Sequence, residues 1–151
     1  MHHRLIISAV GLVLTFGMAV PGVSADQTFH TERIPLIPVA GAPLHQGFVV
    51  DVHANGPKIF AQERYVLVGA APNTTYQVEI GAYPDTACTQ PPLFTMPEAT
   101  LVTNGAGNGE AGLTFYATQT PPPPGTFNLQ WHVLTGGTVA YQTACTAVAV
   151  D

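Results

Sequence analysis

The chain has 151 residues, of which 46% are hydrophobic and only 9% are charged, and its formal net charge is −5 at pH 7. This length fits a single domain that can bury a hydrophobic core without the help of a metal. Its four lysine and arginine residues are too few to neutralise a nucleic-acid backbone or an anionic membrane surface, so we expect neither partner.

The first 25 residues have the layout of a secretory signal peptide. Arg4 precedes an apolar run over residues 5–20, and a Pro-Gly pair and then Val23-Ser24-Ala25 follow. A short cationic start, an apolar stretch and small residues before a cleavage point are typical of such signals, and the run is shorter than the roughly 20 residues of a membrane span. We therefore expect residues 1–25 to be removed. The processed protein is expected to be secreted, periplasmic or in the cell envelope, with no membrane span.

A proline-rich N-terminal arm is expected over residues 26–46. It contains Pro35, Pro38 and Pro43. Because proline lacks the N–H group that a sheet ladder needs, this arm can form at best an interrupted edge strand.

Residues 47–151 are expected to form one all-β domain. Short runs of β-branched and aromatic residues alternate there with turns rich in Gly, Pro and Asn, and no capped helical pattern occurs outside the leader. The expected strands cover residues 48–53, 63–69, 76–80, 100–103, 113–115, 127–133 and 138–150. About seven short strands indicate an antiparallel β-sandwich or a barrel, and we favour the sandwich.

Alternation along these strands assigns side chains to faces. In the run 48–53, Asp51 and His53 share one face, which we expect to point to solvent. In the run 127–133, Trp131 is in phase with three apolar residues and is expected in the core. Four glutamates lie on separate elements, and each is expected to solvate an outer face: Glu63, Glu79, Glu98 and Glu110.

Cys88 and Cys145 are the only cysteines. In an oxidising compartment an even pair most simply forms one disulfide, which would fasten a loop or an edge to the C-terminal strand. A metal or redox pair is the alternative, but no C-x-x-C spacing is present and no histidine is close in sequence.

Two segments carry a resemblance to a known class of domain. The segment 65–80 (YVLVGAAPNTTYQVEI) resembles the strand, proline-centred turn and Tyr-x-Val element of fibronectin-III-like and other immunoglobulin-like extracellular domains. The segment 124–129 (PGTFNL) is similar to the start of a late strand in them. The resemblance spans about residues 47–150 and implies an immunoglobulin-like sandwich scaffold. The disulfide and the lack of an early-strand tryptophan depart from fibronectin type III, and no ligand or site is implied.

Catalysis is not expected. The only serines, Ser8 and Ser24, lie in the leader. Both cysteines are expected to be oxidised, and a threonine nucleophile would need an activating amine or base that nothing in the pattern supplies. We therefore expect no enzymatic activity and no cofactor.

A metal site is the alternative that the histidines leave open. Asp51 and His53 could present two ligands from one strand, and His45 and His132 could complete a tetrahedral zinc site if the fold brought them close. The protein would then be a periplasmic or extracellular metal-binding protein. The simpler interpretation is that these are ordinary polar residues on a sheet surface.

The leading functional hypothesis is an exported, non-catalytic module that binds another macromolecule, either a protein or a carbohydrate. Tyr83 and Tyr116 are the candidate surface aromatics. The candidate contact loops are the one that holds Cys88, the glycine-rich residues 104–109 and the prolines at 121–124. Asn73 begins an Asn-Thr-Thr sequon in an accessible turn. The partner and the oligomeric state stay open.

Overall fold

The computed structural model describes residues 30–53, 59–116 and 125–150, and these residues form nine strands and no helix. None of the described residues therefore belongs to a helix that could cross a membrane. The strands are β1 (His30–Pro38), β2 (Gln46–His53), β3 (Ile59–Val68), β4 (Thr75–Tyr83), β5 (Phe94–Val102), β6 (Gly109–Tyr116), β7 (Gly125–Thr135), β8 (Thr138–Thr143) and β9 (Thr146–Val150).

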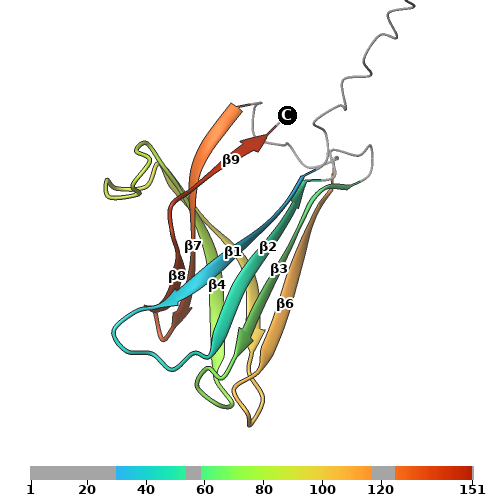
Figure 1. Ribbon diagram of the computed structural model, residues 1–151, viewed down its shortest axis with the longest axis vertical. Helices are drawn as coiled ribbons and strands as arrows, with labels where there is room; N and C mark the ends of the chain where they lie inside the picture. Colours follow the sequence, from blue (N-terminus) through green and yellow to red (C-terminus); the bar gives the residue numbers. More distant parts are fainter. Residues whose placement is uncertain (1–29, 54–58, 117–124, 151) are drawn as a thin grey trace, which may run out of the picture.

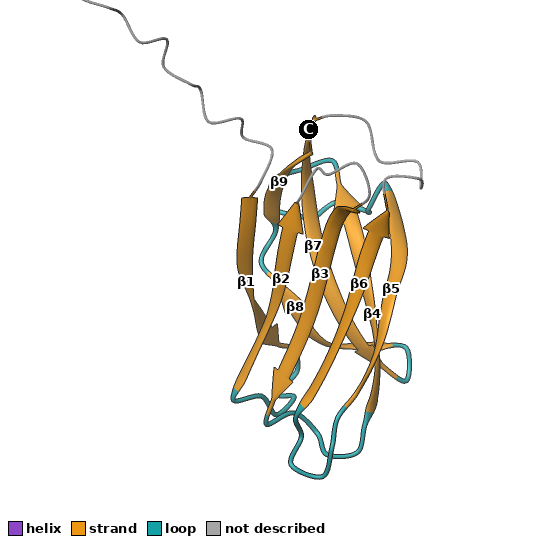
Figure 2. Ribbon diagram, turned by 90° about the vertical axis from the view of Figure 1, so that its right-hand side faces the viewer, coloured by secondary structure: helices purple, strands orange, loops and turns teal. Residues whose placement is uncertain are grey.

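All nine strands belong to one antiparallel sheet. The hydrogen-bonded order is β5-β4-β7-β8-β1-β2-β3-β6, and β9 also pairs with β7. The two end strands, β5 and β6, follow each other along the chain, so the sheet curves into a nearly closed barrel (Figure 1). Figure 2 shows β2, β3 and β6 in front of β4, β7 and β8, with the interior between them. The all-β antiparallel fold is confirmed, whereas a sandwich of about seven strands is corrected to a nine-stranded, nearly closed barrel.

The proline-rich strand β1 divides its pairing between two neighbours. Residues 30–35 pair with β2, ending at Pro35 opposite Phe48, and residues 36–38 pair with β8. Each position of β1 therefore has a ladder partner on one side, as in an edge strand, and the missing N–H groups of Pro35 and Pro38 are tolerated there. This part of the expected N-terminal arm is thus a strand of the barrel.

The C-terminal run forms two strands where we expected one. β7 pairs with β4 on one side, and on the other side with β8 and then with β9. Between β8 and β9 the ladder is replaced by bonds to Thr143. Its hydroxyl accepts a hydrogen bond from the Trp131 backbone N–H at 3.1 Å, and its carbonyl accepts one from the Gln130 side chain at 2.8 Å.

The predicted disulfide is confirmed. Cys88, in the β4–β5 loop, is bonded to Cys145, which lies between β8 and β9. The bond therefore fastens a loop at one end of the barrel to the C-terminal strands, as predicted.

The hydrophobic core fills the barrel between its two sides. Trp131 is fully buried, as expected, and the hydroxyls of Tyr76 and Tyr141 are 3.2 Å apart within the core. The other large buried apolar side chains come from seven strands and are Ile34, Leu36, Val49, Tyr65, Leu67, Val78, Ile80, Leu101, Val133 and Val148.

Candidate functional site

The polar face of β2 points into the barrel. Asp51 is only 1% exposed and His53 only 6%, and His53 Nε2 is 3.1 Å from Asp51 Oδ2. These two residues do share a face, but the expectation that this face meets solvent is wrong. The alternation was ambiguous because Val49 lies on this face while Phe48, Val50 and Val52 lie on the other.

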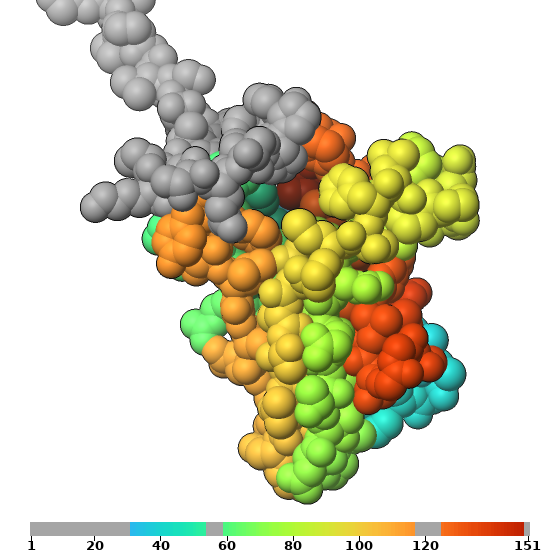
Figure 3. Space-filling model, turned by 180° about the vertical axis from the view of Figure 1, so that it is seen from behind, coloured from blue at the N-terminus to red at the C-terminus, as the bar shows by residue number. Residues whose placement is uncertain are grey.

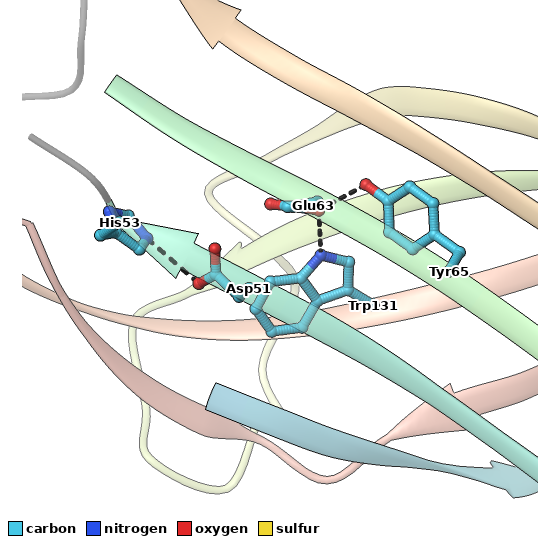
Figure 4. A network of polar contacts seen from close by, with 5 residues as sticks. All are labelled: Asp51, His53, Glu63, Tyr65 and Trp131. Atoms are coloured by element: carbon cyan, nitrogen blue, oxygen red, sulfur yellow. Dashed lines mark hydrogen bonds and ion pairs between the residues drawn. The ribbon is translucent and has the colours of Figure 1, made fainter. Parts of the chain in front are cut away.

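Glu63 of β3 is the centre of the buried polar network. It lies directly opposite Asp51 in the β2–β3 ladder and is 5% exposed. Its Oε2 atom accepts hydrogen bonds from Trp131 Nε1, at 2.8 Å, and from the Tyr65 hydroxyl (Figure 4). Trp131 belongs to β7, so this bond crosses the interior from one side of the barrel to the other. The expected outward orientation of Glu63 is therefore wrong.

A bulge in β5 adds a third buried carboxyl group. Ala99 pairs with Val78 and Pro97 pairs with Glu79, so Glu98 is the extra residue between two ladder positions. Both of its carboxyl oxygens are buried, and neither has a hydrogen-bond partner among the described residues. Glu98 thus also departs from the expected outer face. We call Asp51, Glu63 and Glu98 the acidic cluster.

The other two glutamates lie on the outside, as expected. Glu110 is exposed and forms an ion pair with Arg64. Glu79 is half-buried on the outer face of β4, with its Oε1 atom 4.0 Å from His132 Nδ1.

Burial and neighbouring negative charges raise the pKa values of Glu63 and Glu98 in the acidic cluster. Burial, and next the charge of Asp51, raise the pKa of Glu63 to about 7. Burial, and next the charges of Glu63 and Asp51, raise the pKa of Glu98 to about 8. Both effects favour the neutral carboxyl, since a buried charge without a counter-ion is costly.

Burial and the neighbouring carboxylates shift the pKa of His53 in opposite directions. Burial alone would lower the pKa of His53, but the hydrogen bond and charge of Asp51, with the charges of Glu63 and Glu32, raise it above its ordinary value. The Tyr65 hydroxyl has a strongly raised pKa, because it is buried and donates to Glu63, so it remains a donor.

The described part of the chain brings no lysine or arginine to the cluster. Its two such residues, Arg33 and Arg64, are both exposed. The Arg33 guanidinium lies 3.8 Å from the centroid of the Phe48 ring, and Arg64 pairs with Glu110. The acidic cluster is therefore balanced by protons and by His53 rather than by fixed cations of the described residues.

The four candidate metal ligands do not come together. His45 precedes β2 and packs against Gly69, about 26 Å along the strand from His53 at roughly 3.3 Å per residue. His132 lies on the outer face of β7, where its ring contacts Tyr83. Only Asp51 and His53 meet, and over the described ranges no group of three or more His, Cys, Asp or Glu side chains is arranged to hold a metal ion.

The candidate surface tyrosines lie on different strands. Tyr83 of β4 is half-buried against Gly81 and His132. Tyr116, at the end of β6, is 54% exposed. The candidate contact loop at 121–124 and the expected signal peptide at 1–25 lie outside the described residues. Asn73, which begins the sequon, is exposed in its turn.

The most exposed cluster of apolar side chains was not predicted from the alternating pattern of the sequence. Leu93, Phe94 and Met96 are 69%, 50% and 40% exposed and lie at the start of β5. Phe94 and Met96 pair with the buried residues Ala82 and Ile80, so they lie on the inner side of the sheet and are nevertheless uncovered. The sequence signal that marks them is the Pro-Pro-Leu-Phe-Thr-Met run after the Cys88 loop. We call Leu93, Phe94 and Met96 the β5 apolar face.

A rigid loop precedes this face. The Asp85 carboxylate accepts hydrogen bonds from the Thr89 N–H and hydroxyl and from the Gln90 N–H, at 3.0, 2.8 and 3.2 Å, and these bonds lower the pKa of Asp85. The disulfide at Cys88 holds the loop from its middle, and the Leu93 N–H donates to Ala82 O at 2.7 Å at its end. This loop projects from one end of the barrel (Figure 3).

No protein-family model matches the chain, and searches of curated proteins and of solved structures find no significant match.

Proposed function

We propose that this protein is an exported, non-catalytic binding module with an immunoglobulin-like scaffold, and that it binds another protein through the β5 apolar face. The signal-peptide pattern and the disulfide support export, because disulfides persist in oxidising compartments. The divided pairing of β1, first with β2 and then with β8, supports the immunoglobulin-like assignment, since it separates the barrel into two facing halves.

The observation that carries the proposal is the exposure of Leu93, Phe94 and Met96 beside a loop that is already held in place. Phenylalanine and methionine are enriched in the cores of protein interfaces, and large apolar side chains clustered at a surface mark interaction sites. A loop that is rigid before binding loses little conformational entropy when a partner docks. The face contains no charged side chain, which suits a protein partner.

The test is capture of the partner by photo-crosslinking from Pro92, which is exposed directly before Leu93. The chain with an intact face is compared with Leu93→Asp/Phe94→Asp and with the matched control Val102→Asp. Val102 is 58% exposed at the other end of the same strand. We expect crosslinked proteins with the intact face and the control, and a loss of at least about tenfold with the double variant, which corresponds to about 1.4 kcal/mol. Equal crosslinking by all three chains would contradict the proposal.

A further inference from the structure

The strand that carries the proposed docking face also carries the most loosely held member of the acidic cluster. Phe94 and Met96 precede Glu98 by four and two residues on β5. The first two are exposed, while the carboxyl of Glu98 reaches the interior, where its charge interacts with those of Glu63 and Asp51. A change of charge inside the barrel therefore acts on the strand that presents the face.

Among the strands of the cluster, β5 is the one that can move at least cost. β2 lies between β1 and β3, and β3 lies between β2 and β6, whereas β5 ends the sheet and, among the described strands, pairs with β4 alone. The bulge at Glu98 interrupts that single ladder, and Pro97 contributes no N–H group to it. Few buried apolar side chains hold the first half of β5 in place.

The mobile part would be bounded by two fixed points. At one end, the Leu93 N–H bonds to Ala82 O and the disulfide holds the preceding loop. At the other end, Leu101 is fully buried, and the Thr103 hydroxyl donates to Ala71 O at 2.7 Å. Residues 94–100 lie between these two points, so they can open without unfolding of the barrel.

The described groups around the acidic cluster do not compensate a further negative charge there. His53 already pairs with Asp51, and the donors Tyr65 and Trp131 both point to Glu63. Glu32 of β1 adds a further negative charge that acts on His53. The charged groups of β4, β6 and β7, namely Glu79, Glu110 and His132, lie on the outer face, and the described residues of β8 and β9 carry no formal charge.

We propose that ionisation of Glu98 releases residues 94–100 of β5 from the barrel, so that pH controls the proposed docking face. When Glu98 is neutral, its buried carboxyl is accommodated beside Glu63 and Asp51. When it loses its proton, no lysine or arginine of the described residues lies beside the new carboxylate, and it reaches water most readily by outward movement of its own edge strand. This inference deepens the proposed function by adding regulation to the same face.

Hydrogen exchange of the free protein, followed by mass spectrometry between pH 6 and pH 8 and corrected for intrinsic exchange rates, tests this inference. The opening constant of residues 94–100 is expected to rise about tenfold per pH unit, because opening releases one proton from a group whose closed-state pKa is about 8. β2 and β3 should show no comparable rise. An equal rise across all strands would overturn the proposal, since it would indicate global unfolding.

Two variants distinguish opening caused by ionisation of Glu98 from a general effect of pH on the protein. Glu98→Gln keeps the shape of the side chain but cannot ionise, so the opening of residues 94–100 should become independent of pH. The matched control Glu110→Gln removes a carboxylate from the outer face and should behave as the wild type. An unchanged pH dependence in Glu98→Gln would overturn the inference.

If Glu98→Gln fails to fold, Glu63→Gln provides the second test. This variant removes the negative charge beside Glu98, so the opening constant of residues 94–100 should stop rising at a lower pH than in the wild type. The same end point in both proteins would overturn the inference. No partner is present in these measurements, so they can fail or succeed independently of the crosslinking test of the docking face.

Discussion

The indole N–H of Trp131 donates a hydrogen bond of 2.8 Å to Glu63 Oε2 across the interior of the barrel. The two residues are 68 positions apart in the chain and belong to β7 and β3. This bond joins strands that lie on opposite sides of the core. It also gives a buried carboxyl group one of the two donors that make its burial tolerable.

The coupling between these two residues can be measured. At pH 5, Trp131→Phe and Glu63→Leu should each destabilise the protein by about 1–3 kcal/mol, because each leaves a buried polar partner unsatisfied. The double variant should cost less than the sum of the two, by about 0.5–3 kcal/mol. Urea unfolding followed by circular dichroism gives the three free energies of unfolding. Strictly additive losses would show that the bond is energetically unimportant.

Stability should fall as pH rises. The pKa values of Glu63 and Glu98 in the folded state, about 7 and about 8, lie above their ordinary value of 4.5. The folded protein therefore binds more protons than the unfolded chain between about pH 4.5 and 8. The stabilisation is fully present below pH 4.5 and is lost as pH rises through these two values. The raised pKa of His53 acts in the same direction.

Urea midpoints measured from pH 4.5 to pH 8.5 check this dependence. Each extra bound proton contributes at most about 1.4 kcal/mol per pH unit. Glu63→Gln should flatten the curve, whereas Glu79→Gln, on the outer face, should not. A stability that increases from pH 5 to pH 8 would contradict the assignment of raised pKa values.

Tryptophan fluorescence should report the ionisation of Glu63. The chain contains a single tryptophan, and its indole N–H bonds directly to this carboxyl group. A new negative charge beside the indole should shift the emission of the folded protein, with a midpoint near the Glu63 pKa of about 7. Glu63→Gln should abolish the transition. Its persistence in that variant would assign the titration to another group.

The disulfide should provide a substantial part of the stability. The Cys88→Ser/Cys145→Ser variant is expected to lose about 2–5 kcal/mol, because the bond closes a loop over 57 positions of the chain. Thermal unfolding of the oxidised protein and of the variant measures this loss. A thiol assay of the folded, oxidised protein should detect no free cysteine, and two reactive thiols would contradict the structure.

Gly107 should tolerate no side chain. Its φ angle is +75°, and an added Cβ atom would clash with the backbone oxygen of Ala70. Gly107→Ala is therefore expected to cost about 1–3 kcal/mol from the backbone conformation alone, and more from the clash. Gly105→Ala is the control in the same loop, because the nearest atom to its added Cβ is 4.0 Å away. Similar unfolding midpoints for the two variants would refute the reason given.

Local sequence patterns were sufficient to predict most of the strands, the turns and the disulfide. Strand propensity and turn residues act over a few positions, so β2, β3, β4 and β7 were found close to their observed places. β5 was predicted only from residue 100 onward, because Pro97 and the bulge at Glu98 break the alternation on which the prediction depended. The division of β8 from β9 depends on side-chain bonds of Thr143 that no local pattern shows.

The amino-acid sequence by itself determined an antiparallel all-β protein with one disulfide. Strand alternation and turns are properties of neighbouring residues, and the disulfide depends on a single pair of cysteines. Only the tertiary structure decided which face of each strand is inside. Asp51, His53, Glu63 and Glu98 are buried because the barrel closes around them and because Trp131 and Tyr65 supply donors to Glu63. The orientation of these polar side chains depends on strands far apart in the chain, whose contacts exist only once the sheet has closed.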